Sequence, residues 1–386
     1  MTKTLAPGAM IGIIGGGQLG RMMALAAKAM GDRIAVLDPN EKGPCAQVAD
    51  DIFASQYNDQ EAAVKLAEKS DVVTYEFENI DTPVLEKLIT KSYVPQGSFP
   101  LSVSQHRLRE KEAFKEVGAQ VVPYRPVSSR ADIDEALQEW HSAAVLKTCS
   151  GGYDGKGQRV IKTKQEAKRA WEDLCDKGDL ILEKFVSLKK ELSVVATRNT
   201  HGEMSVFPLA ENEHRNNVLH CTIAPARVSE KIALEAEEIA RNVAKAWDVV
   251  GTFAIEFFLD ENDRLYVNEW APRPHNSGHY TIEACETSQF AQHIRAVTGR
   301  PLGSPRLLRP AVMINILGEH VPGVNASYER IGNKGHIHFY GKDEAKVGRK
   351  MGHITFLGET VEEAIQKSEP AQQIWQQDDR KEEVGQ

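Results

Sequence analysis

The chain has 386 residues, of which 41% are hydrophobic and 26% are charged, and its formal net charge is −8. The length predicts two or three domains of a globular protein, and the acidic balance argues against a surface that coats nucleic acid. No apolar run approaches the roughly 20 residues of a membrane span, and five scattered cysteines favour reduced thiols. We therefore expect a cytoplasmic protein with neither nucleic acid nor a membrane as partner.

The first hundred residues alternate between two apolar patterns. Short buried runs that are typical of strands occur at 10–14, 33–38, 48–53 and 71–75. Helical periodicity lies between them at 21–30 and 59–69. This alternation predicts a parallel, doubly wound sheet over residues 1–104.

The rest of the chain has a different character. A helix at 105–118 leads into shorter strands at 143–146, 159–161 and 180–185, with a helix at 162–175, which together form a second unit over 105–186. The third unit, 187–386, is expected to hold a strand at 191–197, an amphipathic helix at 229–247 and paired strands at 251–259 and 264–270. Its last eighty residues indicate mixed strands that end in a frayed, charged tail at 376–386.

A glycine-rich turn follows the first predicted strand. The run Gly15–Gly20 fits GxGxxG, and Asp38 ends the next strand, where the acid of a dinucleotide site would bind ribose. The turn on its own is compatible with NAD, with another phosphate at the helix N-terminus, or with no ligand. Residues farther along the chain have to decide between these interpretations.

A second glycine-rich segment lies between two predicted strands. Residues 147–158 read KTCSGGYDGKGQ, with a lysine at the start and another inside the loop. Because glycines leave the backbone N–H groups uncovered, such a loop can close on anionic oxygens. The segment therefore predicts a flexible lid over a nucleoside triphosphate.

Two carboxylates interrupt neighbouring apolar strands. Glu256 lies in GTFAIEFF and Glu269 in YVNEWAPRP, and a short turn makes these strands antiparallel neighbours. Two acids side by side in a hydrophobic sheet repel each other, and a divalent cation removes that cost. With Asn268 beside them, the pair predicts a magnesium site; the alternative is that one or both acids face solvent.

These features together resemble the ATP-grasp superfamily and, within it, the 5-(carboxyamino)imidazole ribonucleotide synthetases of purine biosynthesis. The resemblance rests on motifs in order along nearly the whole chain: GGGQLGRM from 15, YEFENI from 75, GGYDGKGQ from 151, NE at 268, RPHNSGH from 273 and GRKMGH from 348. It implies α/β and α+β architecture, with a Rossmann-like parallel N-terminal sheet followed by an ATP-grasp fold, and a homodimer.

The resemblance also implies a reaction and its cofactors. ATP and Mg²⁺ would activate bicarbonate as carboxyphosphate, and the amine of 5-aminoimidazole ribonucleotide would capture the carboxyl group. For ATP it implies Arg107, Lys147, Gly152, Tyr153, Asp154, Gly155, Lys156, Gly157, Gln158, Glu183, Lys184, Phe185, Val186, Glu191, His214, Asn268 and Glu269. For the metal it implies Glu256 and Glu269.

The remaining implied roles concern catalysis and the acceptor. The catalytic set is Tyr153, Asp154, Lys156, Arg273, His275, Lys342 and Arg349. The substrate set is Gly17, Gln18, Leu19, Glu76, Asn276, Ser277 and Lys350. Whether Lys342 or Lys350 contacts the substrate stays open. In one departure from the pattern, Gln105-His106 precedes Arg107 where relatives often carry an acid.

Other functions are weighed against this one. A formate-using glycinamide ribonucleotide ligase or a biotin carboxylase-like subunit would share ATP and magnesium but differ in the acceptor, and the YEFEN and RPHNSGH motifs favour the imidazole. An NAD-dependent dehydrogenase would leave the lysine loop and paired acids unexplained. A non-catalytic nucleotide-binding regulator would not need intact metal carboxylates.

Overall fold

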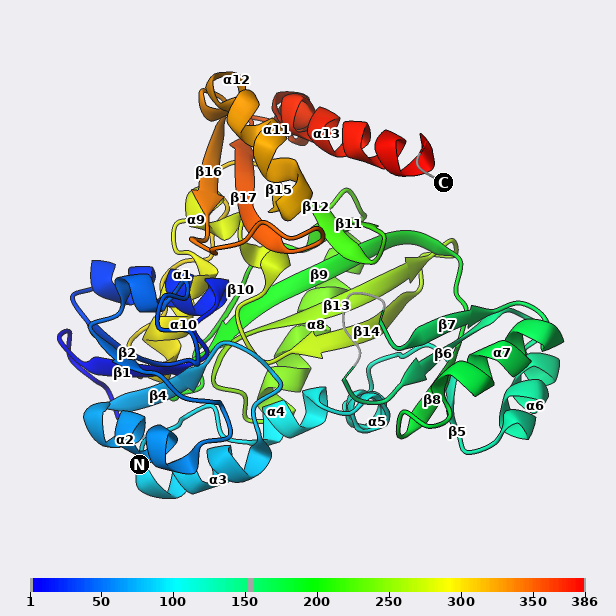
Figure 1. Ribbon diagram of the computed structural model, residues 1–386, viewed down its shortest axis with the longest axis horizontal. Helices are drawn as coiled ribbons and strands as arrows, with labels where there is room; N and C mark the ends of the chain where they lie inside the picture. Colours follow the sequence, from blue (N-terminus) through cyan, green and yellow to red (C-terminus); the bar gives the residue numbers. More distant parts are fainter. Residues whose placement is uncertain (1–2, 152–155, 385–386) are drawn as a thin grey trace.

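The computed structural model describes residues 3–151 and 156–384. The predicted lid residues Gly152, Tyr153, Asp154 and Gly155 therefore lie outside the described residues. The described chain is organised by three sheets of four, nine and four strands (Figure 1).

The N-terminal sheet is parallel throughout, as its alternating pattern predicts. Its order is β3-β2-β1-β4, from β1 (Met10–Ile14), β2 (Arg33–Leu37), β3 (Asp51–Phe53) and β4 (Val72–Tyr75). Strand β1 is central and buried along its whole length, which explains its unbroken apolar run. The associated helices are α1 (Gln18–Ala29), α2 (Gln60–Lys69) and α3 (Thr82–Lys91), the last of which the sequence analysis missed.

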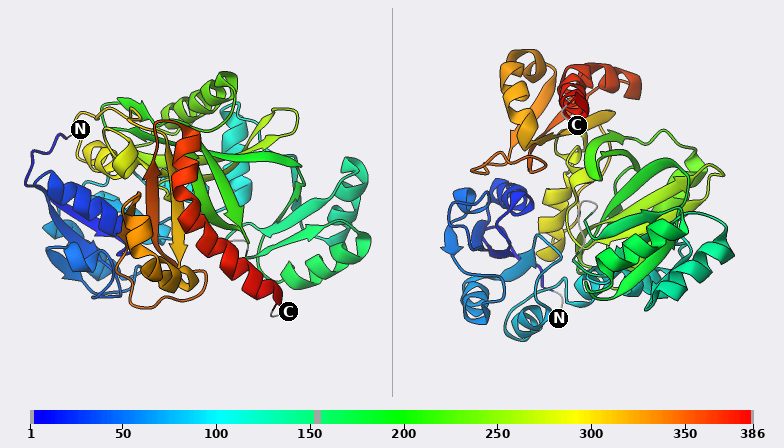
Figure 2. Two further views of the ribbon diagram at one scale, coloured as in Figure 1. Left: turned by 90° about the horizontal axis from the view of Figure 1, so that it is seen from above. Right: turned by 45° about the vertical axis from the view of Figure 1, so that its right-hand side comes forward.

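A small antiparallel sheet forms a separate lobe at the opposite end of the molecule from the N-terminal sheet (Figures 1 and 2). Its order is β5-β8-β6-β7, from β5 (Tyr124–Val127), β6 (Ala144–Thr148), β7 (Gln158–Ile161) and β8 (Leu180–Lys184). Helices α6 (Arg130–Trp140) and α7 (Lys164–Leu174) pack with it. Helix α7 begins where predicted, because Thr163 and Glu166 form a capping box.

The largest sheet is built from antiparallel pairs in the order β14-β13-β9-β11-β12-β15-β17-β16, with β10 paired to β9. Helix α8 (Glu230–Ala246) covers it with a stripe of buried aliphatic residues. The strands are β9 (Leu188–Arg198), β10 (Met204–Val206), β11 (Ala210–Arg215), β12 (Val218–Ala224), β13 (Gly251–Asp260), β14 (Leu265–Ala271), β15 (Ala311–Leu317), β16 (Gly335–Phe339) and β17 (Lys350–Leu357).

Two short helices connect the N-terminal sheet to the others. The predicted helix over 105–118 is in fact α5 (Arg107–Glu116), preceded by the separate helix α4 (Phe99–Ser104). The break falls at His106, whose backbone is extended, and the Gln105 side chain donates to the carbonyls of Glu78 and Ile80. These bonds hold the linker against the N-terminal domain. Lys111 of α5 in turn donates to the carbonyls of Val267 and Asn268 on β14.

The C-terminal region contains more helix than its glycine-punctuated pattern predicts. Besides α9 (Thr281–Ala284) and α10 (Gln289–Val297), it holds α11 (Val321–Ala326), α12 (Tyr328–Gly332) and α13 (Val361–Val384). Most of the tail predicted to fray therefore belongs to α13. Apolar side chains of its first four turns, including Ala364, Ala371 and Trp375, are buried at helical spacing, although Pro370 interrupts the pattern.

The length and apolarity of a helix decide whether it could cross a membrane. Within the described residues, no helix combines the length and the apolar character needed to cross a bilayer.

Candidate active site

Many of the predicted site residues converge on one cleft between the small sheet and the large sheet. Its volume is about 550 Å³, and both sheets contribute to its walls. The predicted residues that line it are Arg107, Lys147, Lys156, Gln158, Glu191, His214, Glu256, Asn268, Glu269, Arg273, His275, Asn276 and Lys350. Positions as far apart as 107 and 350 thus share one site.

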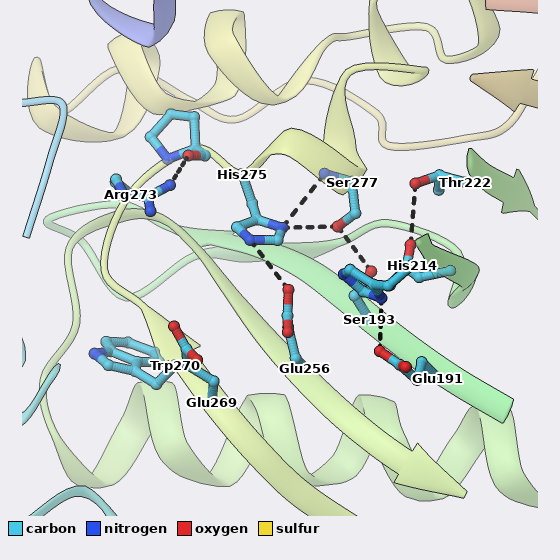
Figure 3. A network of polar contacts seen from close by, with 12 residues as sticks. Glu191, Ser193, His214, Thr222, Glu256, Glu269, Trp270, Arg273, His275 and Ser277 are labelled. Atoms are coloured by element: carbon cyan, nitrogen blue, oxygen red, sulfur yellow. Dashed lines mark hydrogen bonds and ion pairs between the residues drawn. The ribbon is translucent and has the colours of Figure 1, made fainter. Parts of the chain in front are cut away.

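The two predicted metal carboxylates face each other across neighbouring strands. Glu256 of β13 and Glu269 of β14 are register partners, next to a β-bulge (Figure 3). Burial, followed by the negative charge of Glu269, raises the pKa of Glu256 to about 7. The Nη1 of Arg107 lies 3.5 Å from Oε2 of Glu269. A cation between Glu256 and Glu269 would relieve the repulsion between their negative charges, so the pair fits Mg²⁺.

His275 lies against this pair as a neutral ring. Its Nδ1 accepts the N–H of Ser277 at 3.3 Å, which leaves the ring proton on Nε2, and Nε2 lies 3.3 Å from Oε1 of Glu256 (Figure 3). Burial, followed by the positive charge of Arg273, holds the pKa of His275 well below its usual range. Ser277 is fully buried behind it and accepts a hydrogen bond from Ser193 at 2.8 Å. Ser277 therefore orients His275 and does not line the cleft.

The predicted phosphate lysine is held in a buried charge cluster. Lys147 on β6 donates to Oε2 of Glu183 on β8 at 2.6 Å. Lys111 on α5 lies 3.5 Å from the other carboxylate oxygen. Despite burial, Lys111 and Lys147 lower the pKa of Glu183 to about 2. The side chain of Glu183, predicted to line the adenine, points into this cluster and does not line the cleft.

Sequence reasoning missed two residues of α5. Glu110 is 2% exposed and accepts the N–H of Trp270 at 2.7 Å, while Lys111 is fully buried. Burial, followed by the charge of Glu269, raises the pKa of Glu110 to about 8. The run RLREKEAFKE looks like a solvated helix, so no local signal marks these charges as buried.

The predicted nucleotide residues on β9 and β11 form a pair. The Nδ1 of His214 lies 2.6 Å from Oε2 of Glu191, and both residues line the cleft. Burial is the largest single influence and lowers the pKa of His214, but the contact with Glu191 and the negative charges of Glu256 and Glu191 together outweigh it and raise the pKa overall. Lys184 is the last residue of β8, and the side chain of Phe185 is exposed. The cleft is lined by none of the three predicted residues Lys184, Phe185 and Val186.

The RPHNSGH segment supplies unsatisfied polar groups. Arg273 forms a bidentate ion pair with Glu78, a residue that sequence reasoning quoted only as part of a motif. Asn276 is 8% exposed, and neither its amide oxygen nor its amide nitrogen has a hydrogen-bond partner among the described residues. Because buried amides are normally paired, Asn276 is suited to a polar ligand in the cleft.

The N-terminal glycine turn is bonded to the protein's own carboxylates. Glu76 accepts the N–H groups of Gly17 and Gly20, and Asp38 accepts that of Gly16 at 2.6 Å. A phosphate at this turn, whether of NAD or of another ligand, would have to displace Glu76 and Asp38. The neighbouring Leu19 is half-buried and, like the turn, lies outside the lining of the cleft.

The C-terminal basic residues divide between two places. Lys350 lines the cleft, whereas Lys342 donates to Oε1 of Gln18 at 2.7 Å and to the carbonyl of Lys350. Burial, followed by Arg349, lowers the pKa of Lys342 to about 8. Arg349 donates to the carbonyl of Glu344 at 3.0 Å and does not line the cleft. Lys342 thus connects the glycine turn to β17.

Three family models match successive parts of the chain. The ribonucleotide synthetase preATP-grasp domain matches residues 9–105, the ATP-grasp domain matches 112–290, and the phosphoribosylaminoimidazole carboxylase C-terminal domain matches 311–367. The N5-carboxyaminoimidazole ribonucleotide synthase of Bacillus subtilis strain 168 is 52% identical over 365 residues, which are 95% of this chain and 96% of that protein.

The chain belongs to the N5-carboxyaminoimidazole ribonucleotide synthase family. It is an ATP-grasp ligase, and its fold class, a Rossmann-like parallel sheet followed by an ATP-grasp fold, is confirmed.

Solved structures of the family agree with this assignment. An ADP complex of a synthetase has a TM-score of 0.94 at 50% identity and covers 98% of this chain and 99% of that one. An Aspergillus clavatus synthase bound to ADP and 5-aminoimidazole ribonucleotide has a TM-score of 0.88 at 31% identity, with coverages of 95% and 98%. The family thus contains solved complexes with both the spent nucleotide and the acceptor.

Proposed function

We propose that the cleft described above holds ATP, magnesium and bicarbonate for the reaction of this family. That reaction is the ATP-dependent carboxylation of 5-aminoimidazole ribonucleotide in purine biosynthesis. The observation that carries the proposal is a single cleft in which the register-paired Glu256 and Glu269 face the same space as the buried Lys147. Phosphoryl transfer requires carboxylates that hold a metal ion and a cation that binds phosphate in the same site.

Lys147 and Arg107 are the cations that we assign to the ATP phosphates. Both line the cleft, together with Lys156 and Gln158 of the lid segment. The paired Glu191 and His214 suit the ribose, because a carboxylate with a fixed partner accepts hydroxyl hydrogen bonds well. Gly157, Lys184 at the end of β8, and the next two residues, Phe185 and Val186, complete the proposed nucleotide site.

Glu256 and Glu269 are the residues that would hold magnesium, with Asn268 beside them. Their shared register and the raised pKa of Glu256 indicate a site that gains from a cation. When bound, the metal would neutralise the triphosphate oxygens. No group of three or more histidines, cysteines or carboxylates suited to a metal occurs in the described part of the chain, so ligand oxygens would complete the coordination.

Bicarbonate is a poor electrophile and requires activation. An oxygen of bicarbonate would attack the γ-phosphorus of ATP and release ADP, and the amine of the acceptor would then attack the carboxyl carbon and release phosphate. Arg273 and Asn276 supply the donors for these anions, and His275 supplies a proton-bearing Nε2. Tyr153 and Asp154, assigned to the acceptor with Lys156, lie outside the described residues.

The acceptor ribonucleotide is assigned to the space between the cleft and the glycine turn. Lys350 faces the cleft, and Lys342 faces Gln18, so the two lysines border this space from β17 and its preceding loop. Arg349 would add positive charge, and Gly17, Leu19, Glu76 and Ser277 are retained in the proposed site. Of Lys342 and Lys350, only Lys350 lines the cleft, so we assign Lys350 the direct contact with the substrate.

Phosphate release from ATP tests the proposed function. We expect turnover that requires Mg²⁺ and bicarbonate and that rises severalfold when 5-aminoimidazole ribonucleotide is added. Glycinamide ribonucleotide with formate serves as the matched control and should give no stimulation. If the aminoimidazole ribonucleotide leaves the rate unchanged while ATP still binds, the acceptor assignment is wrong.

Three broader properties are proposals of the same kind. We assign the domains to residues 1–104, 105–186 and 187–386, an arrangement supported by the three sheets. The homodimer rests on the family resemblance alone. A cytoplasmic location is supported by five cysteines that are all free thiols.

A further inference from the structure

The most unusual group outside the cleft is the ammonium of Lys111. Its side chain is fully buried on α5, yet it does not line the cleft. Nζ donates to the carbonyl of Asn268 at 2.9 Å and lies 3.5 Å from Oε1 of Glu183. A lysine is almost never fully buried unless it is paired, so this position requires a reason.

Glu183 explains the position. Its carboxylate is 3% exposed and lies between two lysines, with Lys147 at 2.6 Å on one oxygen and Lys111 at 3.5 Å on the other. The two lysines differ in what else they contact. Lys147 lines the cleft and can reach a ligand, whereas Lys111 is fixed by the carbonyls of Val267 and Asn268.

A nucleotide in the cleft would change this arrangement. The proposed function assigns Lys147 to the ATP phosphates, and several phosphate charges compete strongly with one carboxylate for the same ammonium. As Lys147 turns toward phosphate, Glu183 loses its shorter ion pair. A buried carboxylate left without a partner is strongly unfavourable and would oppose ATP binding.

We propose that Lys111 is a positioning residue for ATP: it stays in place as the second counterion of Glu183 and so frees Lys147 to bind phosphate. This inference rests on the proposed role of Lys147. Lys111 makes no contact with the nucleotide. It acts by keeping the buried carboxylate paired in both states.

Nucleotide binding measured by calorimetry tests this role in the full chain. Lys111→Met should weaken ATP about 10-fold and leave adenosine, which has no phosphates, within about 2-fold. Lys115→Met is the matched control, because Lys115 lies one turn along the same helix with a half-exposed side chain paired to Glu112. A general loosening of the cleft would instead weaken ATP and adenosine alike, and that result would overturn the proposal.

A second comparison does not depend on the folding of Lys111→Met. In a Glu183→Gln background no buried carboxylate needs a counterion, so Glu183→Gln and Lys111→Met/Glu183→Gln should bind ATP equally within about 2-fold. A 10-fold difference between these two variants would contradict the proposal. Failure of the unmodified chain to bind ATP would contradict the proposed function itself, and with it the inference that rests on that function.

Discussion

Two pairs of carboxylates in this protein have opposite surroundings. Glu76 and Asp38 accept backbone N–H groups of the glycine turn, so they hold the turn between β1 and α1 against the ends of β4 and β2. Glu256 and Glu269 face each other across β13 and β14. Glu256 lies 3.3 Å from the neutral His275, and Glu269, whose side chain is 48% exposed, lies 3.5 Å from Arg107. The comparison teaches that the first pair is committed to backbone donors, whereas the second pair lines the cleft and is available to a cation.

The largest effect is expected from Glu269→Gln. If Glu256 and Glu269 hold magnesium, the variant should lose ATP-dependent turnover by a factor on the order of 1000, because the charge of the triphosphate is no longer neutralised. The melting temperature should change little, because the variant loses both the repulsion from Glu256 and the charge contact with Arg107 at 3.5 Å. Magnesium-dependent phosphate release and thermal unfolding measure the two effects, and retained turnover would reject the metal role.

A smaller effect, on stability, is expected from Glu76→Ala. The buried N–H groups of Gly17 and Gly20 would lose a charged acceptor, which should lower the free energy of unfolding by about 2–3 kcal/mol. Urea denaturation measures this change. Glu68→Ala, at an exposed position of α2, is the control and should stay within about 0.5 kcal/mol of the unmodified chain. Equal stability of the two variants would show that Glu76 does not hold the turn.

The pH dependence of stability separates the pairs further. The pKa of Glu256 is raised to about 7 in the folded chain from an ordinary value of 4.5, so the folded state binds the extra proton between these values. Stability from this group is therefore present at low pH and is lost as pH rises through 7. In the absence of metal, the free energy of unfolding of Glu256→Gln should rise by about 1–2 kcal/mol relative to that of the unmodified chain as the pH increases from 5.5 to 8.

Urea denaturation in a metal chelator at several pH values checks this sign. Addition of magnesium and ADP should reduce the difference at pH 8, because a cation removes the repulsion. A gap between the two proteins that stays constant from pH 5.5 to 8 would contradict the raised pKa.

Local patterns in the sequence predict the register of Glu256 and Glu269 well. A short turn between two apolar strands is enough to place Glu256 opposite Glu269, and the structure has this register. Likewise, Thr163 and Glu166 mark the start of α7 through a capping box. Both features depend on residues close together in the chain, so spacing alone determines them.

Features that depend on distant segments escape this reasoning. Glu76 meets Gly17 across 59 positions, and Lys111 meets Asn268 across 157, so neither contact leaves a local pattern. Helix α5 looks solvated because its charges are buried only after β14 and β8 cover them. Helix α13 was missed because Pro370 and a charged end conceal the apolar spacing that packs Trp375 under the sheet.

Metal binding distinguishes the two carboxylate pairs most directly. Titration of Mn²⁺ in the presence of ADP, followed by electron paramagnetic resonance, counts the metal ions bound by each variant. The account predicts that the unmodified chain and Glu76→Gln bind Mn²⁺ with similar affinity, whereas Glu269→Gln loses the ion. Retention of Mn²⁺ by Glu269→Gln together with its loss from Glu76→Gln would contradict the account.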